Sequence, residues 1–86
     1  MAKIVLYVSG SCGYCRAAKA LLEKKNIPFE EIDLTGDNAG REALVVKSGG
    51  RRTVPQIFID GQGIGGYTEL AALDRSGELA RMLGEA

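Results

Sequence analysis

Two cysteines, Cys12 and Cys15, are the residues of this 86-residue chain whose type and spacing could do chemistry. They stand in the stretch SGSCGYC, after the apolar run KIVLYV and before RAAKALLEKK, a segment typical of a helix. Such a pair could be a redox couple, half of a metal site or a structural disulfide. Each alternative makes different demands on the rest of the chain.

The position of the pair favours redox chemistry. A cysteine at a strand-to-helix junction lies beside the unpaired N–H groups of the first helical turn, and these groups and the helix dipole stabilise a thiolate. We therefore expect Cys12, at the start of the helix, to be the thiolate. Cys15, about one turn further on, is expected to be the resolving thiol.

The metal and disulfide alternatives fit less well. A structural zinc site needs four Cys or His ligands, whereas the sequence holds two cysteines and no histidine. A single pair could still deliver Cu(I), which accepts two thiolates. Small copper chaperones, however, follow the order β-α-β-β-α-β and usually carry Met where Gly10 stands. A disulfide around two residues would remove little chain entropy.

The elements that must position the pair follow from hydrophobic periodicity and turn residues. Residues 4–8 form an apolar run of strand length, and we expect this strand to be covered on both faces. A helix is expected over about 16–25, and it ends near Asn26 and Pro28. A second strand lies within 28–34, and Asp37 or Asn38 caps a helix that runs to Lys47. Strands flank the turn at Asp60-Gly61, a helix opens at Tyr67 or Thr68, and a short helix closes the chain.

The expected order is therefore β-α-β-α-β-β-α-α. The first β-α-β unit requires a parallel, right-handed crossover, and the later hairpin adds an antiparallel pair. This predicts an α/β fold with a four-stranded mixed sheet and helices on both faces, forming a single domain over 1–86.

Composition limits the function classes. Eleven basic residues balance eleven acidic ones, so no net charge favours nucleic acid or an anionic membrane. No apolar segment approaches the roughly 20 residues that span a bilayer, and no secretory signal is recognisable. These features predict a cytoplasmic protein. Thiols stay reduced in the cytoplasm, where a cysteine pair is more often catalytic or metal-binding than structural.

SCGYC, together with RRTVPQIFIDGQGIGGYTEL, resembles the glutaredoxin family, and the resemblance covers nearly the whole chain. It points to small bacterial dithiol glutaredoxins, which have the thioredoxin fold. It implies a glutathione-dependent thiol-disulfide oxidoreductase that acts on protein–glutathione mixed disulfides and protein disulfides. Its partners would be glutathione, such proteins and, indirectly, glutathione reductase. A related redoxin reduced by thioredoxin reductase shares the fold, but Tyr14 and the Gly65-Gly66 pair favour glutathione.

The resemblance also assigns roles to individual residues. Cys12 would be the nucleophile and Cys15 its resolving partner. In a cis-proline loop, the backbone of Val54 would pair with the cysteine moiety of glutathione, and the backbone after Gly65-Gly66 would receive the γ-glutamyl carboxylate. The implied glutathione-binding set is Tyr14, Arg52, Thr53, Val54, Pro55, Gly66, Tyr67 and Thr68.

The chain departs from many relatives near this groove. Ser9, Gly10 and Ser11 stand where many relatives have a lysine, so Arg51 or Arg52 would have to bind the glycine carboxylate of glutathione. Many relatives have an acidic residue at the position of Thr68, next to the γ-glutamyl amino group of glutathione. We expect Glu69 to supply the negative charge that is lost there.

Gly13, between the cysteines, replaces a proline common in dithiol relatives. Some relatives with glycine here hold a [2Fe–2S] cluster between two protomers, each giving its first cysteine and one bound glutathione. The alternative function is therefore a cluster carrier or store in which Cys12 is the ligand. In that case a cluster-bridged dimer would replace the expected monomer.

Overall fold

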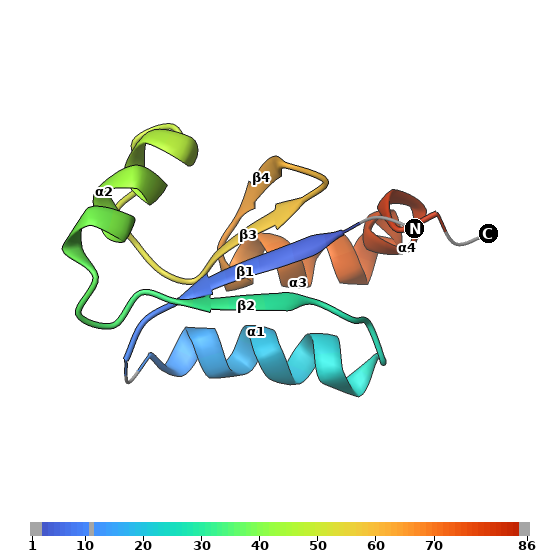
Figure 1. Cartoon of the computed structure of the whole chain (residues 1–86). Helices are drawn as coiled ribbons and strands as arrows, with labels where there is room; N and C mark the ends of the chain where they lie inside the picture. The colour runs from blue at the N-terminus through green and yellow to red at the C-terminus, as the bar shows by residue number, and fades with distance from the viewer. Residues whose placement is uncertain (1–2, 11, 85–86) are drawn as a thin grey trace.

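The computed structural model describes residues 3–10 and 12–84. Four strands and four helices follow one another in the predicted order (Figure 1). They are β1 (Ile4–Val8), α1 (Gly13–Lys24), β2 (Glu30–Asp33), α2 (Asn38–Lys47), β3 (Gln56–Ile59), β4 (Gln62–Gly65), α3 (Tyr67–Ser76) and α4 (Glu78–Met82).

The four strands form one mixed sheet in the order β2-β1-β3-β4. β1 pairs in parallel with β2 and antiparallel with β3, so that Leu6 lies opposite Glu31 on one side and Ile57 on the other. β3 and β4 form the antiparallel hairpin expected from Asp60-Gly61. The mixed sheet predicted from the element order is confirmed.

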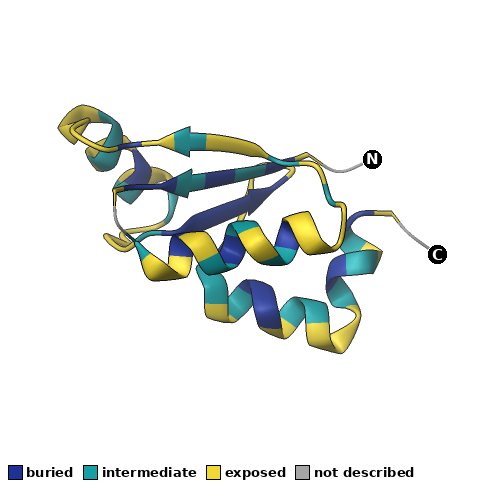
Figure 2. Cartoon of the chain, turned by 90° about the horizontal axis from the view of Figure 1, so that it is seen from below, coloured by how far each residue is buried: buried dark blue, intermediate teal, exposed yellow. Residues whose placement is uncertain are grey.

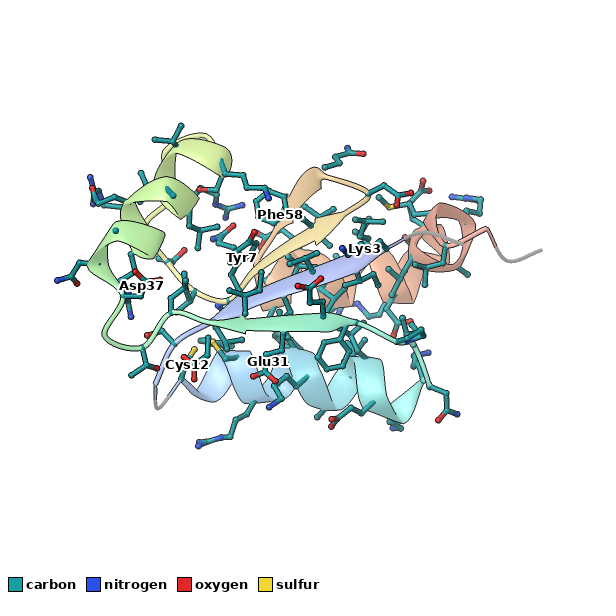
Figure 3. The ribbon with its side chains drawn as sticks, viewed as in Figure 1. Lys3, Tyr7, Cys12, Glu31, Asp37 and Phe58 are labelled. Carbon is teal, nitrogen blue, oxygen red and sulfur yellow. The ribbon has the colours of Figure 1, made fainter. Side chains whose placement is uncertain are left out.

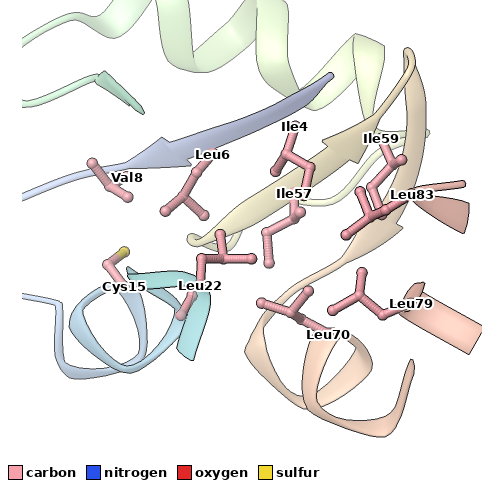
Figure 4. Packing of buried hydrophobic residues seen from close by; sticks show 11 residues of the cluster. Ile4, Leu6, Val8, Cys15, Leu22, Ile57, Ile59, Leu70, Leu79 and Leu83 are labelled. Carbon is pink, nitrogen blue, oxygen red and sulfur yellow. The ribbon is translucent and has the colours of Figure 1, made fainter. Parts of the chain in front are cut away.

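The main core lies on the face of the sheet that α1 and α3 cover. Figure 2 shows these two helices side by side, each with buried residues along its length. Figure 4 shows how strand and helix side chains meet there. The buried cluster contains Ile4, Leu6, Val8, Cys15, Ala18, Leu22, Ile57, Ile59, Leu70, Leu79 and Leu83.

A smaller cluster fills the opposite face, beneath α2. Leu34, Leu44 and Phe58 are buried there, and the Tyr7 ring meets Phe58 edge-to-face with centroids 5.5 Å apart. Helices therefore lie on both faces, as predicted. β1 is covered less completely on the face beneath the short α2, where Val5 and Tyr7 stay partly exposed.

The ends of the helices follow from local chemistry. The Asp37 carboxylate accepts the N–H of Gly40 at 2.8 Å and thereby caps α2. After α1, Asn26 adopts a positive φ of 57°, a conformation that Asn tolerates better than most residues, and the chain turns toward β2. Among the described residues, no helix is long and apolar enough to cross a membrane.

Candidate active site

Cys12 is the N-cap residue of α1, at the end of the sheet where α2 also lies (Figure 3). Its Sγ accepts the backbone N–H of Cys15 at 3.1 Å, and its thiol lies 3.6 Å from the carbonyl oxygen of Val54. The residue is partly exposed. The sulfur is therefore both accessible and directed at the loop that precedes β3.

Cys15 differs because it is buried in the main core, with 4% of its surface exposed. Burial, as the largest cause, and the hydrogen bond with Cys12 together raise the pKa of the Cys15 thiol to about 11, against an opposing backbone hydrogen bond from Ser9. Cys15 therefore keeps its proton at neutral pH. The geometry gives the pair one accessible sulfur and one protonated, buried sulfur.

The loop facing Cys12 contains a cis peptide bond between Val54 and Pro55, as the resemblance implied. Gln56, which is 2% exposed, donates from Nε2 to the carbonyl oxygen of Thr53 at 2.9 Å. This hydrogen bond fixes the loop to the first residue of β3. The carbonyl of Val54 is thereby held toward the Cys12 thiol.

The start of α3 borders the same loop. Gly66 is its N-cap residue, and a Cβ there would lie 3.2 Å from the carbonyl oxygen of Pro55, so a side chain would crowd the loop. The N–H of Gly66 donates to the Glu69 carboxylate at 2.7 Å, and this hydrogen bond lowers the pKa of Glu69. Tyr67 and Thr68 form the first turn of the helix.

Two tyrosines connect α1 to α3 beside the cysteines. The rings of Tyr14 and Tyr67 are stacked, with centroids 6.1 Å apart and an interplanar angle of 27°. Tyr14 lies in the first turn of α1, two residues after Cys12, and 66% of its surface is exposed. The ring pair gives this side of the site an accessible apolar wall.

Three arginines line a hollow of about 300 Å³ between α2 and the loop before β3, together with Thr53 and Val54. Arg52 lies 3.1 Å from the Glu42 carboxylate, and Arg51 lies 3.8 Å from that of Glu69. Arg41 donates from Nη2 to the hydroxyl of Ser9. Sequence reasoning did not single out Arg41, whose contact with Ser9 joins residues far apart in the chain.

This geometry favours redox chemistry over metal binding. Within residues 3–10 and 12–84, no cluster of three or more His, Cys, Asp or Glu side chains could hold a metal ion. Cu(I) held by the pair alone would have to displace the proton of Cys15, whose sulfur is buried in the core. The two sulfurs are better suited to successive attack than to joint coordination.

Comparison with known proteins also indicates redox chemistry. The family description "Glutaredoxin" matches residues 4–64. The chain is 48% identical to glutaredoxin 3 of Escherichia coli K12 over 83 residues, which is 96% of this chain and 99% of that protein. The chain belongs to the glutaredoxin family. It is a dithiol glutaredoxin, a thiol-disulfide oxidoreductase that depends on glutathione as its co-substrate.

Solved structures of glutaredoxins match the fold. A buckwheat glutaredoxin–glutathione complex superposes with a TM-score of 0.86 at 32% identity, covering 96% of this chain and 77% of that one. A glutaredoxin from Brucella melitensis gives 0.82 at 40% identity, covering 94% and 87%. The thioredoxin-like fold is thus confirmed, with the cysteine pair at the start of its first helix.

Proposed function

We propose that this glutaredoxin reduces protein–glutathione mixed disulfides and protein disulfides, with Cys12 as the attacking and Cys15 as the resolving residue. The contrast between the two sulfurs carries the proposal. Cys12 is accessible and accepts a backbone N–H, whereas Cys15 is buried and protonated. A nucleophilic cysteine must reach its substrate as a thiolate, whereas a resolving cysteine must stay unreactive until the mixed disulfide has formed.

On a glutathione mixed disulfide, the Cys12 thiolate attacks the glutathione sulfur. The disulfide breaks, the protein leaves as a thiolate that takes up a proton, and Cys12 becomes bonded to glutathione. The thiolate of a second glutathione then attacks the glutathione sulfur on Cys12. This step releases glutathione disulfide and regenerates the Cys12 thiolate. Cys15 takes no part in this cycle.

On a protein disulfide, Cys12 attacks one substrate sulfur and Cys15 resolves the mixed disulfide. Burial is the largest cause of the raised pKa of Cys15, and its hydrogen bond with Cys12 and the charge of a Cys12 thiolate are two further causes. Both disappear once Cys12 has formed a bond to the substrate. The first step thus makes Cys15 easier to ionise, and its attack releases the reduced substrate and leaves a disulfide for two glutathiones to reduce.

Glutathione would bind along the loop before β3. In this proposal its cysteine moiety pairs with the backbone of Val54, next to the sulfur of Cys12. Its γ-glutamyl carboxylate meets the N-terminus of α3, where free N–H groups favour an anion. The contributing residues are Tyr14, Arg52, Thr53, Val54, Pro55, Gly66, Tyr67 and Thr68. Support comes from the contact of the Cys12 thiol with the carbonyl of Val54, from the stacked rings of Tyr14 and Tyr67, and from the closeness of the start of α3 to Pro55.

This cycle draws on a pool of reduced glutathione, which glutathione reductase would restore. The cytoplasm provides such a pool, and we propose that compartment. Glutathionylated or disulfide-bonded proteins would be the partners that meet Cys12.

The proposal is tested with a glutathione mixed disulfide of a cysteine peptide, coupled to glutathione reductase and NADPH oxidation. We expect Cys12→Ser to abolish turnover and Cys15→Ser to retain most of it. On a protein disulfide, both variants should fail. An equal loss in both variants on the mixed disulfide would refute the division of roles.

The cluster-carrier alternative, based on Gly13, stays a prediction. A Cβ at Gly13 would meet nothing within 4 Å, so the segment between the cysteines is open. Cys12 is the accessible one of the two cysteines, so each protomer would give one protein thiolate. Anaerobic purification with glutathione tests it: a coloured dimer with iron would support it, and an iron-free monomer would rule it out.

A further inference from the structure

The segment 9–11 separates the end of β1 from Cys12, and the place of the attacking sulfur depends on how this segment is held. β1 ends at Val8, and Cys12 already caps α1. The segment belongs to neither element, so contacts from elsewhere in the chain have to fix it. The structure describes two of its residues, Ser9 and Gly10, and each is hydrogen-bonded to a residue that follows β2.

Gly10 is held by a side chain where a sheet would use a carbonyl. Beyond the end of β2, the Leu34 N–H still donates to the Val8 carbonyl at 2.8 Å, as in a parallel ladder. The next bond of such a ladder would bring the Gly10 N–H to the Leu34 carbonyl. That carbonyl instead accepts the N–H of Asp37 at 3.0 Å, where the chain turns into α2. The Gly10 N–H donates to the Thr35 hydroxyl at 2.7 Å.

The partners of Thr35 fix the direction of its hydrogen bonds. A backbone N–H can only donate, so the Thr35 hydroxyl oxygen accepts from Gly10. A carboxylate can only accept, so the same hydroxyl gives its proton to Oδ1 of Asp33 at 2.6 Å. The Thr35 N–H donates to that oxygen as well, at 2.9 Å. These two hydrogen bonds, that of the hydroxyl first, lower the pKa of Asp33, which is therefore a carboxylate at neutral pH.

The Gly10 N–H, the Thr35 hydroxyl and the Asp33 carboxylate thus form a hydrogen-bond relay. The charge at its end strengthens the relay, because a hydroxyl that donates to a carboxylate becomes a better acceptor. Thr35 and Asp33 are not among the residues proposed to bind glutathione. The relay therefore acts on the reaction through the position of Cys12.

We propose that Thr35, oriented by Asp33, is a positioning residue for the attacking sulfur of Cys12. Gly10 stands two positions before Cys12, so a shift at Gly10 moves the sulfur away from the Val54 carbonyl, which lies 3.6 Å from it. Attack on a disulfide requires the sulfur to lie in line with the bond that breaks, and a substrate held along Val54 does not follow a displaced sulfur. The inference rests on the proposed function, because it takes Cys12 as the attacking residue.

The test uses the Cys15→Ser protein, in which Cys12 is the remaining cysteine. The rate at which Cys12 takes glutathione from a peptide–glutathione mixed disulfide is measured in a single turnover, without free glutathione. We expect Thr35→Val to lower this rate about threefold to tenfold, the factor that corresponds to one net hydrogen bond. Thr35→Ser keeps the hydroxyl and should restore the rate. Asp33→Asn should give an intermediate loss, because the acceptor of the relay loses its charge.

Alkylation of Cys12 by iodoacetamide in the same variants separates positioning from a change in the thiolate. Iodoacetamide is small and needs no alignment with Val54, so Thr35→Val should change the alkylation rate by less than about twofold. Ser76→Ala is the matched control, because the Ser76 hydroxyl also accepts a backbone N–H, that of Glu78 at 3.2 Å, at the junction of α3 and α4. It should leave both rates unchanged.

The inference is overturned if Thr35→Val transfers glutathione at the rate of the unsubstituted threonine, if it slows alkylation as much as transfer, or if Thr35→Ser does not restore transfer. A slow transfer in Ser76→Ala would overturn it too, because the loss would then follow any broken hydroxyl contact.

A failure of the proposed function is separable, since it would appear as no transfer to Cys12 even with Thr35 in place. Positioning is then measured by NMR hydrogen exchange of the backbone N–H of residue 15, which donates to the Cys12 sulfur. Faster exchange in Thr35→Val than in Ser76→Ala would support the inference, and equal exchange would overturn it.

Discussion

The backbone N–H of Cys15 donates to the Sγ of Cys12 over 3.1 Å, so the residue proposed to resolve the disulfide also holds the sulfur proposed to attack. The contact comes from the helix start itself, where Cys12 is the N-cap and its side chain accepts an otherwise unpaired N–H. Since this donor belongs to the backbone, it survives replacement of the Cys15 side chain. This is why Cys15→Ser is expected to spare the first chemical step.

Gly65→Ala should destabilise the protein by about 1–3 kcal/mol, the cost of a non-glycine residue in an unfavourable backbone region. Gly65 has a φ of 111°, and a Cβ there would meet the side chains of Arg51 and Glu69 within 2.8 Å. Urea unfolding would measure the change. Gly13→Ala is the matched control, because its Cβ would meet nothing within 4 Å, and we expect no loss of stability from it.

Leu70→Ala should lower the free energy of unfolding by about 2–5 kcal/mol, because it leaves a cavity where α3 packs on the sheet. Leu70 is fully buried in the main core. Val46→Ala, at an apolar residue that is 82% exposed, should change stability by less than about 0.5 kcal/mol. Comparable losses in the two variants would contradict the assignment of the core.

Acidification should weaken the start of α3. The hydrogen bond from Gly66 lowers the pKa of Glu69 in the folded protein, so the carboxylate stabilises the fold above the ordinary Glu pKa. This contribution is lost as pH falls through the lower, folded-state pKa. Glu69→Gln should therefore lose more stability at pH 7 than at pH 3, measured by urea unfolding.

Glu42→Gln serves as the control for that pH dependence, since Glu42 pairs with Arg52 on the surface and caps no helix. Glu42→Gln should change the free energy of unfolding only slightly at both pH values. An equal loss at pH 7 and pH 3 in Glu69→Gln would show that the carboxylate charge does not stabilise α3.

Much of the fold could be predicted from the sequence because its signals are local. The apolar run of β1 and the turn at Asp60-Gly61 mark strands directly, and Asp37 caps α2 where the sequence indicated. The cysteine pair was also predictable, since its place between a strand and a helix is local. The cis bond before Pro55 came only from the resemblance to the family.

The partners of the arginines could not be predicted, because they depend on how distant elements pack. Ser9 and Arg41 are separated by 32 positions and meet only after α2 has folded over the end of β1. Adjacent residues Arg51 and Arg52 look alike in the sequence but point to Glu69 and Glu42, on different helices. Likewise, the stacking of Tyr14 on Tyr67 requires α1 and α3 to lie side by side.

The most direct test of the central claim is alkylation of the reduced protein with iodoacetamide from pH 6 to pH 11, with the modified cysteine identified by peptide mass spectrometry. The account predicts that Cys12 is modified first across this range. Cys15, whose pKa is raised to about 11 by burial, should react appreciably only near the top of it. Modification of Cys15 at neutral pH, at a rate equal to that of Cys12 or above it, would contradict the assignment of attacking and resolving sulfurs.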